Sequence, residues 1–504
     1  MNKEFFYDLK SGTDIRGVAV KGIEGQEFNL SDEAIHKIIS AFALWLGTKQ
    51  NKDVETLTVS VGRDSRITGK HILDICAHSL KNYGIRVLDC GLASTPSMFM
   101  TTLDLKCDGA VMITASHHPY YRNGLKFFTP NGGLEGTDIT SILDLAVADK
   151  SPKLSNNGEI IITDYMSDYS RHLRDIICKG INSEDYSHPL KGFKIAVDAG
   201  NGAGGFYADM VLKPLGADIS ASRFLEPDGM FPNHVPNPEN KDAMKAISSA
   251  VIDNKCDLGV IFDTDVDRGA AVDSTGKEIS RNRLVALASA IALEDNPGGT
   301  VVTDSITSDG VTEFIERELG GKHRRFKRGY KNVINEALRL NREGICAPLA
   351  IETSGHAAMS ENYFLDDGAY LCTKIIIKAV KLKKQGLNLN SVLSKLKEPL
   401  EADEYRLKIL DKDFKAYGNS VLKDLEQYAL ENGIAIVPNN YEGVRLSFNK
   451  DNGDGWCLLR LSVHDPIMPL NIESNSQGGI NKIIKLITPF LSRCNKLDLI
   501  NLNL

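Results

Sequence analysis

Three short runs of almost continuous apolar residues place the strongest constraint on the fold of this chain. They are LTVSVGRDSR (57–66), FKIAVDAGNGAGG (193–205) and TVVTDSITSDG (300–310), and each ends in small and polar residues. Strands that are apolar at nearly every position are typical of parallel sheets covered on both faces. Helical spacing of apolar residues follows the first and third runs. The pattern therefore predicts three α/β domains of similar design with mainly parallel mixed sheets.

The C-terminal part of the chain has a different pattern. Residues 413–433 have the pattern of a helix that ends at a glycine, and two apolar segments, 443–448 and 456–463, follow it. Only the turn-rich stretch NKDNGDG separates these segments, which favours a hairpin over a crossover helix. We therefore expect a fourth, α+β domain with an antiparallel sheet. Polar and proline-containing linkers give the expected domains as residues 1–160, 161–297, 298–400 and 401–504.

The composition argues against several classes of protein. With 504 residues, 42% of them hydrophobic and 25% charged, the chain reads as a globular protein of several domains. Its net charge of −7 argues against a nucleic-acid-binding surface as the main function. Nine scattered cysteines without a C-x-x-C pair favour reduced thiols in a cytoplasmic protein over a disulfide framework or a zinc site. We see no signal-peptide pattern and no apolar run near the ~20 residues that span a bilayer.

The segment LGVIFDTDVDRGAAVD (258–273) is the strongest local signal of chemistry, because an apolar run delivers Asp263, Asp265 and Asp267 in succession. Three adjacent carboxylates repel one another, and oxygen-only ligands suit a hard cation such as Mg²⁺. An EF-hand loop does not fit, since its sixth position would be Arg268 and its twelfth Ser274. The remaining alternative is a solvated acidic turn after a strand.

A second candidate is Ser116 in TASHHP, which follows the apolar run VMI. The serine is not in a G-x-S-x-G elbow, so hydrolase-type acyl chemistry is disfavoured. A phosphate ester on Ser116 would supply the oxygen that an unsaturated Mg²⁺ site lacks. Lys126, after an Asn-Gly turn, is a candidate for proton transfer or phosphate binding. Taken alone, Ser116 also fits a structural role, and His117 and His118 also fit ordinary loop positions.

Two further polar stretches follow apolar runs. In ETSGH, Glu352, Ser354 and His356 offer the mixture of acceptors and donors that hydroxyl-rich ligands require. The alternative for this stretch is an ordinary polar loop.

The stretch RLSVHDP places Arg460, Ser462 and His464 at the end of a strand, where a guanidinium and backbone N–H groups could hold a phosphate. In isolation a structural role explains this stretch as well. Arginines near the N-terminus, Arg16 in GTDIRG and two in GRDSR, fit either ion pairs or a domain that faces an anionic ligand.

In combination, these stretches resemble the landmarks of the α-D-phosphohexomutase superfamily, which includes phosphoglucomutases, phosphomannomutases and phosphoglucosamine mutases. The matching stretches run in order over nearly the whole chain: GTDIRG, GRDSR, STPSM, TASHHP, VDAGNGAGG, PDGMFPNHVPNPE, DTDVDR, ETSGH and RLSVHDP. The resemblance implies three similar α/β domains and a more mobile α+β domain, arranged around a central cleft.

The resemblance also implies the roles of individual residues. Ser116 would be the phosphorylated serine and Lys126 the lysine of its loop. One Mg²⁺ per chain would be bound by Asp263, Asp265 and Asp267 together with Ser116. The remaining implied roles are catalysis by Arg16, Arg268 and His356, sugar binding by Glu352, Ser354 and His356, and binding of the non-reacting phosphate by Arg460, Ser462 and His464.

The reaction that the resemblance implies interconverts hexose 1-phosphate and hexose 6-phosphate, of glucose, mannose or both. Phosphoserine would give its phosphoryl group to the substrate, form hexose 1,6-bisphosphate, and then take back the other phosphate. The bisphosphate would also serve as activator. The expected partner is a small hexose phosphate, without nucleic acid or membrane, and the expected assembly is a monomer or homodimer in the cytoplasm.

Three positions depart from the family pattern. Thr353 stands where dual-specificity mutases typically carry Met and phosphoglucosamine mutases usually carry Gln, His464 replaces a threonine, and Tyr330 replaces a histidine of several relatives. The SGH ending of the sugar loop favours the dual glucose/mannose group. The alternatives are a phosphoglucosamine mutase, a non-catalytic protein that binds sugar phosphate, and a phosphatase that uses the same serine.

Overall fold

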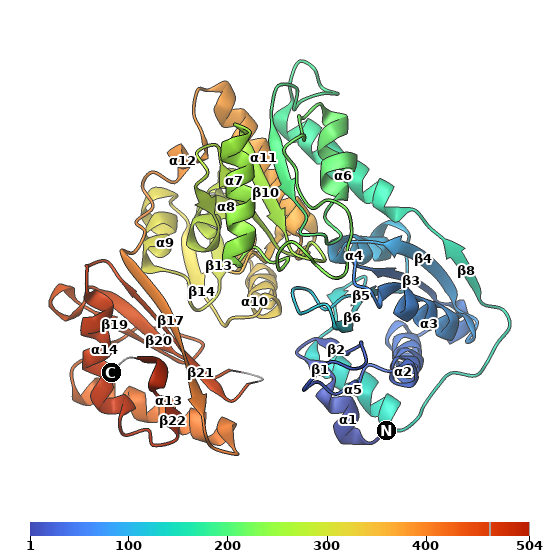
Figure 1. The fold of residues 1–504 in the computed structure, drawn as a ribbon, viewed down its shortest axis with the longest axis horizontal. Helices are drawn as coiled ribbons and strands as arrows, with labels where there is room; N and C mark the ends of the chain where they lie inside the picture. The colour runs from blue at the N-terminus through green and yellow to red at the C-terminus, as the bar shows by residue number, and fades with distance from the viewer. Residues whose placement is uncertain (463–464, 503–504) are drawn as a thin grey trace. The chain divides into compact units, whose positions relative to one another are not determined.

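The computed structural model describes residues 1–462 and 465–502 (Figure 1). The chain forms two compact units. The first contains Met1–Ser280, Ser354–Ala358 and Leu365–Ser391, and the second contains Arg281–Thr353, Met359–Phe364 and Val392–Leu504. Among the described residues, no helix has the length and apolar character needed to cross a membrane.

The first sheet of the first unit has the strand order β1-β2-β6-β5-β3-β4-β8, and β7 pairs with β6. Strands β5, β3, β4 and β8 are parallel, whereas β6 and β2 join them in antiparallel pairs. The strands are β1 (Lys10–Ser11), β2 (Asp14–Val18), β3 (Thr58–Arg63), β4 (Arg86–Leu92), β5 (Gly109–Ile113), β6 (Arg122–Thr129), β7 (Gly132–Gly133) and β8 (Glu159–Ile162).

Helices cover this sheet because its central strands are apolar on both faces. All five residues of β5 and the four inner residues of β3 are buried. α3 packs on β3 and β4 (Figure 1). Each fully buried Val, Ile or Leu here contributes about 1.5–3 kcal/mol of transfer free energy. The helices are α1 (Lys3–Asp8), α2 (Asp32–Gln50), α3 (Gly69–Lys81), α4 (Thr95–Asp104), α5 (Gly136–Val147) and α6 (Tyr165–Ile181).

The second sheet of the first unit has the order β12-β11-β10-β9, with β9 and β10 parallel and the other pairs antiparallel. Every residue of β9 and β10 is buried, as their apolar sequences predict, and Asp198 at the end of β9 is buried with them. Beyond its first sheet, the first unit contains β9 (Ile195–Asp198), η2 (Tyr207–Leu212), η3 (Lys213–Leu215), α7 (Lys241–Asp253), β10 (Leu258–Phe262), β11 (Gly269–Asp273), β12 (Glu278–Ile279), α11 (Gly368–Lys384), and all but the last residue of β16 (Ala357–Met359) and of α12 (Leu389–Val392).

The second unit begins with a parallel arrangement in which β13 lies between β14 and β15. The unit thus repeats the α/β design at the third apolar run. Its elements in this part are α8 (Arg281–Asp295), β13 (Thr300–Thr303), α9 (Asp309–Glu313), η4 (Phe314–Glu318), β14 (Lys322–Arg325), α10 (Tyr330–Arg342), β15 (Leu349–Ile351) and η5 (Ser360–Asn362).

The C-terminal sheet has the order β18-β19-β20-β21-β17-β22, and its pairs are antiparallel. β19 and β20 form the predicted hairpin. β20 ends at Leu459, before the expected end, because Arg460 N–H bonds to the carbonyl of Pro469, which has no N–H to return. The elements are β17 (Glu401–Ile409), α13 (Phe414–Glu431), β18 (Ala435–Ile436), β19 (Val444–Phe448), η6 (Lys450–Asn452), β20 (Gly455–Leu459), β21 (Ile467–Ser474), α14 (Gly479–Leu491), β22 (Leu497–Asp498) and η7 (Ile500–Leu502).

Candidate active site

Ser116 lies in the loop after β5, at the carboxyl edge of the parallel part of the first sheet. Its φ of 50° is in the left-handed region, which costs a non-glycine residue about 1–3 kcal/mol. The surrounding structure compensates: the Ser116 N–H donates to Thr114 Oγ1 at 2.8 Å. This conformation directs the Ser116 hydroxyl to the second sheet, where it donates to Asp263 Oδ2 at 3.1 Å.

The guanidinium of Arg66 holds the loop around Ser116. Arg66 is 1% exposed and follows β3, the strand next to β5. Its Nη2 donates to the carbonyl oxygens of Ser116 and, at 2.6 Å, His118. Its Nη1 donates to the carbonyls of Pro119 at 2.8 Å and Arg122 at 2.9 Å. Arg66 therefore binds the protein's own backbone, and its Nε lies 3.3 Å from Asp64 Oδ2, which is the ion pair that was one of the two alternatives for GRDSR.

The three aspartates lie in the loop between β10 and β11, and all are buried. One oxygen of each lies within 4.8 Å of the others. Burial and the neighbouring carboxylates raise the pKa of Asp263 well above its usual range. Burial also opposes ionisation of Asp267, but nearby cations, Lys126 foremost, hold the pKa of that carboxyl below its usual range. Within the trio, Asp267 therefore loses its proton more readily than Asp263 does.

Lys126 provides the nearest positive charge to this trio. It lies on β6, opposite Met112 of β5, and is 4% exposed. Its Nζ donates to Asp265 Oδ2 at 3.0 Å and to Asp267 Oδ2 at 2.5 Å. Thr95, the first residue of α4, also holds Asp265: its hydroxyl donates to Oδ2 at 2.5 Å and its N–H to the carbonyl at 2.8 Å.

The donor set of the trio fits a hard cation. Among the described residues, none donates a hydrogen bond to Asp265 Oδ1 or Asp267 Oδ1, although both atoms are buried. His356 Nδ1 lies 3.8 Å from Asp267 Oδ1, which is too far for a hydrogen bond. A buried carboxylate oxygen without a partner is costly, so such atoms indicate a ligand. Together with Asp263 and the Ser116 hydroxyl, they form an all-oxygen set of the kind that divalent cations bind.

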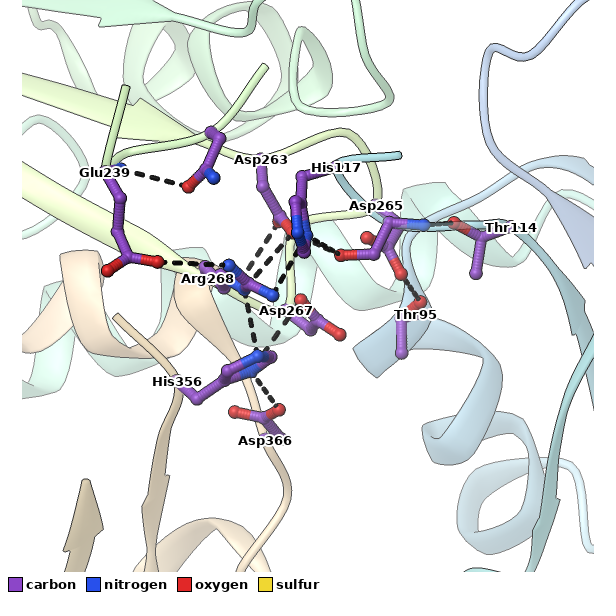
Figure 2. A network of polar contacts seen from close by, with 12 residues as sticks. Thr95, Thr114, His117, Glu239, Asp263, Asp265, Asp267, Arg268, His356 and Asp366 are labelled. Carbon is purple, nitrogen blue, oxygen red and sulfur yellow. Dashed lines mark hydrogen bonds and ion pairs between the residues drawn. The ribbon is translucent and has the colours of Figure 1, made fainter. Parts of the chain in front are cut away.

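A chain of polar contacts continues from the trio through Arg268 (Figure 2). Arg268 Nε donates to His356 Nε2 at 2.9 Å, and Nη2 lies 3.1 Å from His117 Nδ1. Arg268 Nη1 lies 3.7 Å from Glu239 Oε2. His356 Nδ1 in turn lies 2.6 Å from Asp366 Oδ2. Arg268 thus joins the serine loop, the acidic loop and the SGH segment.

The histidines beside Ser116 are neutral at physiological pH. Burial is the main cause, and the positive charge of Arg268 adds to it, so the pKa of His117 falls to about 2. Burial and then Arg16 lower the pKa of His118 to about 3. Arg16 lies on β2, opposite Gly124 of β6, with its Nη2 2.8 Å from Asp14 Oδ2.

The predicted sugar-binding residues fall in both units. In the second unit, Glu352 Oε1 accepts a bond from Gly329 N–H at 2.6 Å, and the Thr353 hydroxyl donates to Asp304 at 2.8 Å. Ser354 and His356 belong to the first unit and are both buried.

The predicted phosphate loop follows β20 in the second unit. Arg460 Nη1 lies 3.8 Å from Glu442 Oε1. Ser462 N–H donates to the carbonyl of Ile467 at 3.0 Å, and the Ser462 hydroxyl accepts a bond from Asp465 N–H at 3.2 Å. His464 lies outside the described residues.

Sequence reasoning missed the contacts that Thr95 and Asp366 make with the candidate site residues. Thr95 is 170 positions before Asp265, and STPSM was noted only as a family landmark. Asp366 is ten positions after His356 in a stretch that carries two adjacent aspartates. Its place after an apolar run and before a helix was the available signal.

Comparison with protein-family models identifies three consecutive matches. The models of phosphoglucomutase/phosphomannomutase α/β/α domains I, II and III match residues 10–153, 167–276 and 280–398.

Proteins with sequences similar to this chain are named phosphoglucomutase or phosphomannomutase/phosphoglucomutase. A phosphoglucomutase of Neisseria gonorrhoeae is 28% identical over 479 residues, which cover 94% of this chain and 95% of that protein. A phosphomannomutase/phosphoglucomutase of Pseudomonas syringae pv. tomato is 28% identical over 426 residues, covering 84% and 85%. The crystal structure of a phosphoglucomutase/phosphomannomutase family protein from Burkholderia thailandensis has a TM-score of 0.80 at 24% identity and covers 98% of each chain, which shows a shared fold.

Proposed function

The chain belongs to the phosphoglucomutase/phosphomannomutase family of the α-D-phosphohexomutase superfamily, and from this premise we propose that it interconverts the 1- and 6-phosphates of glucose, mannose or both. The observation that carries the proposal is the 3.1 Å contact between the Ser116 hydroxyl and Asp263 of the acidic trio. This contact joins a possible phosphate carrier to a possible metal site.

In the proposed reaction, the Oγ–P bond of phosphorylated Ser116 breaks as a free hydroxyl of the hexose monophosphate attacks phosphorus. The sugar gains the phosphoryl group and becomes a 1,6-bisphosphate, while its hydroxyl proton passes to a basic side chain. After the bisphosphate reverses in the site, Ser116 Oγ attacks the other phosphorus, the bond from phosphorus to the sugar oxygen breaks, and that oxygen takes back the proton from the basic side chain. The net change is an isomerisation, because one phosphoryl group is given and one is recovered.

The residues around Ser116 have distinct proposed tasks. Asp263, Asp265 and Asp267, with an oxygen on Ser116, would hold one Mg²⁺, since the set contains only oxygen ligands. When bound, the ion offsets the negative charge of the phosphoryl group in both transfers. Lys126, whose Nζ contacts Oδ2 of Asp265 and of Asp267, would hold or move a proton beside this set.

Other charged residues would bind and orient the substrate. Arg16 and Arg268 carry positive charge beside the serine loop and would attract the reacting phosphate. His356 would transfer the proton of a sugar hydroxyl. The remaining proposed contacts are Glu352 and Ser354 with sugar hydroxyls, and Arg460, Ser462 and His464 with the phosphate that does not react.

A coupled assay tests the proposal directly. Purified protein with Mg²⁺ and a trace of hexose 1,6-bisphosphate is given the 1-phosphates of glucose, mannose and glucosamine in separate reactions. We expect formation of glucose or mannose 6-phosphate. Turnover of the glucosamine substrate alone would show a phosphoglucosamine mutase, and binding without turnover would show a non-catalytic relative.

Ser116→Ala is the matched variant for this assay. We expect loss of detectable mutase turnover with an unchanged thermal melt, because the substitution removes only the oxygen that carries phosphate. Intact mass should also show a phosphate on a fraction of the wild type and none on the variant. A variant that keeps most of its activity would refute the phosphoserine mechanism.

A further inference from the structure

We propose that Asp366 is a positioning residue that fixes the ring orientation and the tautomer of His356. The inference rests on the proposed function for its catalytic consequence, but its structural content stands on the contacts of His356 alone. In the first unit, the buried imidazole of His356 lies between Arg268 on one edge and Asp366 on the other (Figure 2).

The chemistry of the two partners determines where the proton lies. A guanidinium only donates hydrogen bonds, so the 2.9 Å contact from Arg268 Nε requires a lone pair on His356 Nε2. A neutral imidazole carries one N–H, which must then be on Nδ1. That N–H points to Asp366 Oδ2 at 2.6 Å, and a carboxylate only accepts. Asp267 Oδ1, 3.8 Å from Nδ1, is also an atom that only accepts, so the three contacts agree on a single tautomer.

Asp366 is itself held in place through its other oxygen. Oδ1 accepts a bond from Ala357 N–H at 3.0 Å, so one carboxylate joins the ring of His356 to the backbone one residue later. Both His356 and Asp366 are less than 9% exposed, and water has little access to replace either bond. A ring bound at Nδ1 in this way is prevented from flipping.

The backbone around Asp366 is anchored to the acidic loop. Asp367 caps α11 by accepting a bond from Tyr370 N–H at 2.8 Å, and the Tyr169 hydroxyl lies 2.8 and 2.7 Å from its two oxygens. Gly368 N–H donates to the carbonyl of Val266 at 3.0 Å. A Cβ on Gly368 would lie 2.4 Å from the Arg268 carbonyl carbon, so only glycine permits this approach.

In this arrangement the lone pair on Nε2 of His356 accepts the bond from Arg268 Nε, so Nε2 could take a proton from a substrate only when that bond gives way. Asp366→Asn disturbs the arrangement without changing the size of the side chain. An amide offers one acceptor and one donor where the carboxylate offers two acceptors. If its oxygen stays on Ala357 N–H, its NH₂ meets Nδ1 and forces the proton to Nε2, where it opposes Arg268 Nε–H. If the amide group is instead rotated by about 180°, its NH₂ faces Ala357 N–H and the bond from Ala357 is lost.

Nitrogen-15 NMR of histidine-labelled full-length protein tests the tautomer without any substrate. The chain has 11 histidines, and His356→Gln identifies the signal of interest. We expect the Nδ1–H tautomer in the wild type, and a shift to Nε2–H or a mixture in Asp366→Asn. The Nε2–H tautomer in the wild type would overturn the proposal, even if the variant failed to fold.

A double-mutant cycle separates positioning from a general structural role. Alone, Asp366→Asn should lower kcat about 10- to 100-fold with KM within about twofold, by analogy with the carboxylates that orient metal-bound histidines. In a His356→Gln background it should cost less than about twofold more, because Asp366 acts through that ring. Equal losses in both backgrounds would overturn the proposal.

Tyr169→Phe is the control for this cycle. It removes a hydroxyl that bonds to Asp367, the neighbour of Asp366, and leaves both contacts of the His356 ring intact. We expect an unchanged tautomer and a kcat within about twofold of the wild type. If the wild type turns over no hexose phosphate, the proposed function fails while the NMR measurement still decides the tautomer.

Discussion

At the scale of single residues, the most consequential charge in the site is the ammonium of Lys126. It is buried and contacts two of the three aspartates, so it offsets part of the charge that a metal would also offset. Lys126 and a divalent cation are thus alternative or joint counter-charges for one set of carboxylates. Removal of Lys126 should therefore lower turnover without weakening the binding of a metal.

Replacement of Lys126 tests this expectation. In Lys126→Met we expect kcat to fall about 10²- to 10⁴-fold, the range for loss of a general acid or base. The dissociation constant of Mg²⁺, measured by calorimetry, should stay equal or decrease, because the carboxylates lose a competing cation. Lys70→Met, at an exposed lysine that pairs with Asp74, is the control. Weaker Mg²⁺ binding in Lys126→Met would contradict this account.

The sequence allows a site to be proposed where candidate residues lie in one short segment. Asp263, Asp265 and Asp267 occupy alternate positions of a single loop, so their local pattern is sufficient to propose a metal site. Thr95 was out of reach because its contact with Asp265 depends on how two distant segments meet. The contacts of Arg66 could not be predicted either, because the sequence around an arginine after a strand is the same whether the side chain binds a ligand or four backbone carbonyls.

At the scale of elements, the loop from residue 116 to residue 122 depends on one side chain from a neighbouring strand end. Parallel β3 and β5 bring their carboxyl ends to the same edge, which places Arg66 beside the loop after β5. The planar guanidinium reaches four carbonyls at once, which a lysine ammonium cannot do.

Arg66→Lys should therefore loosen this loop while keeping the charge. We expect the free energy of unfolding to fall by about 2–3 kcal/mol, from lost hydrogen bonds to a charged group, and kcat to fall about 10²-fold because Ser116 is displaced. Urea unfolding measures the first effect, and hydrogen exchange of the peptide around residues 115–122 reports loop opening. Arg63→Lys in the same segment is the control. Unchanged protection of the loop would contradict the clamp.

His323 gives the second unit a dependence of stability on pH. It lies on β14, with Thr303 and Thr312 hydroxyls 2.7 and 2.8 Å from its two ring nitrogens. Burial, and then Arg325 and Arg445, hold its pKa well below the usual value. Below about pH 6.5 the unfolded chain takes up a proton that the folded chain refuses, so stability is lost as pH falls.

The size of this effect is at most about 1.4 kcal/mol per pH unit. Urea unfolding at about pH 7, 6 and 5 should show a smaller loss of stability in His323→Gln than in the wild type, after each is compared with itself at pH 7. The exposed His71, changed to Gln, should leave the wild-type dependence intact. Equal dependences in all three proteins would show that His323 takes up its proton in the folded state.

Element types were predictable where the pattern was long and unbroken. The buried strands β3, β9, β10 and β13, and the hairpin of β19 and β20, follow from apolar continuity and turn composition. The early end of β20 was not predicted, because it depends on Pro469 of the facing strand, and a single-strand pattern carries no information about its partner.

At the scale of the whole molecule, the chain consists of two compact units with separate hydrophobic clusters. One cluster, around α2 and β3, belongs to the first unit, and another, around β20 and α14, belongs to the second. The acidic trio, Ser116, Lys126 and the ring of His356 are all in the first unit. A ligand that binds only the trio should therefore raise the free energy of unfolding of the first unit and leave that of the second unit unchanged.

This location predicts how Mg²⁺ affects unfolding. A ligand that binds only the folded state stabilises it by about 2.7 kcal/mol at a concentration of about 100 times its dissociation constant. We expect Mg²⁺ to slow hydrogen exchange in first-unit peptides, those around β5, β10 and β11 above all, and to leave the core of the C-terminal sheet unchanged. Chelator should reverse the effect and stop turnover.

Asp265→Asn is the variant that completes this test. It keeps the oxygen that can accept from Thr95 and Lys126 but removes the charge of a carboxylate whose other oxygen accepts no bond among the described residues. We expect exchange in its first unit to become insensitive to Mg²⁺, while both units stay folded by circular dichroism. Protection by Mg²⁺ in the variant equal to that in the wild type would place the ion elsewhere, because a hard cation cannot lose one of three charged ligands without a loss of affinity.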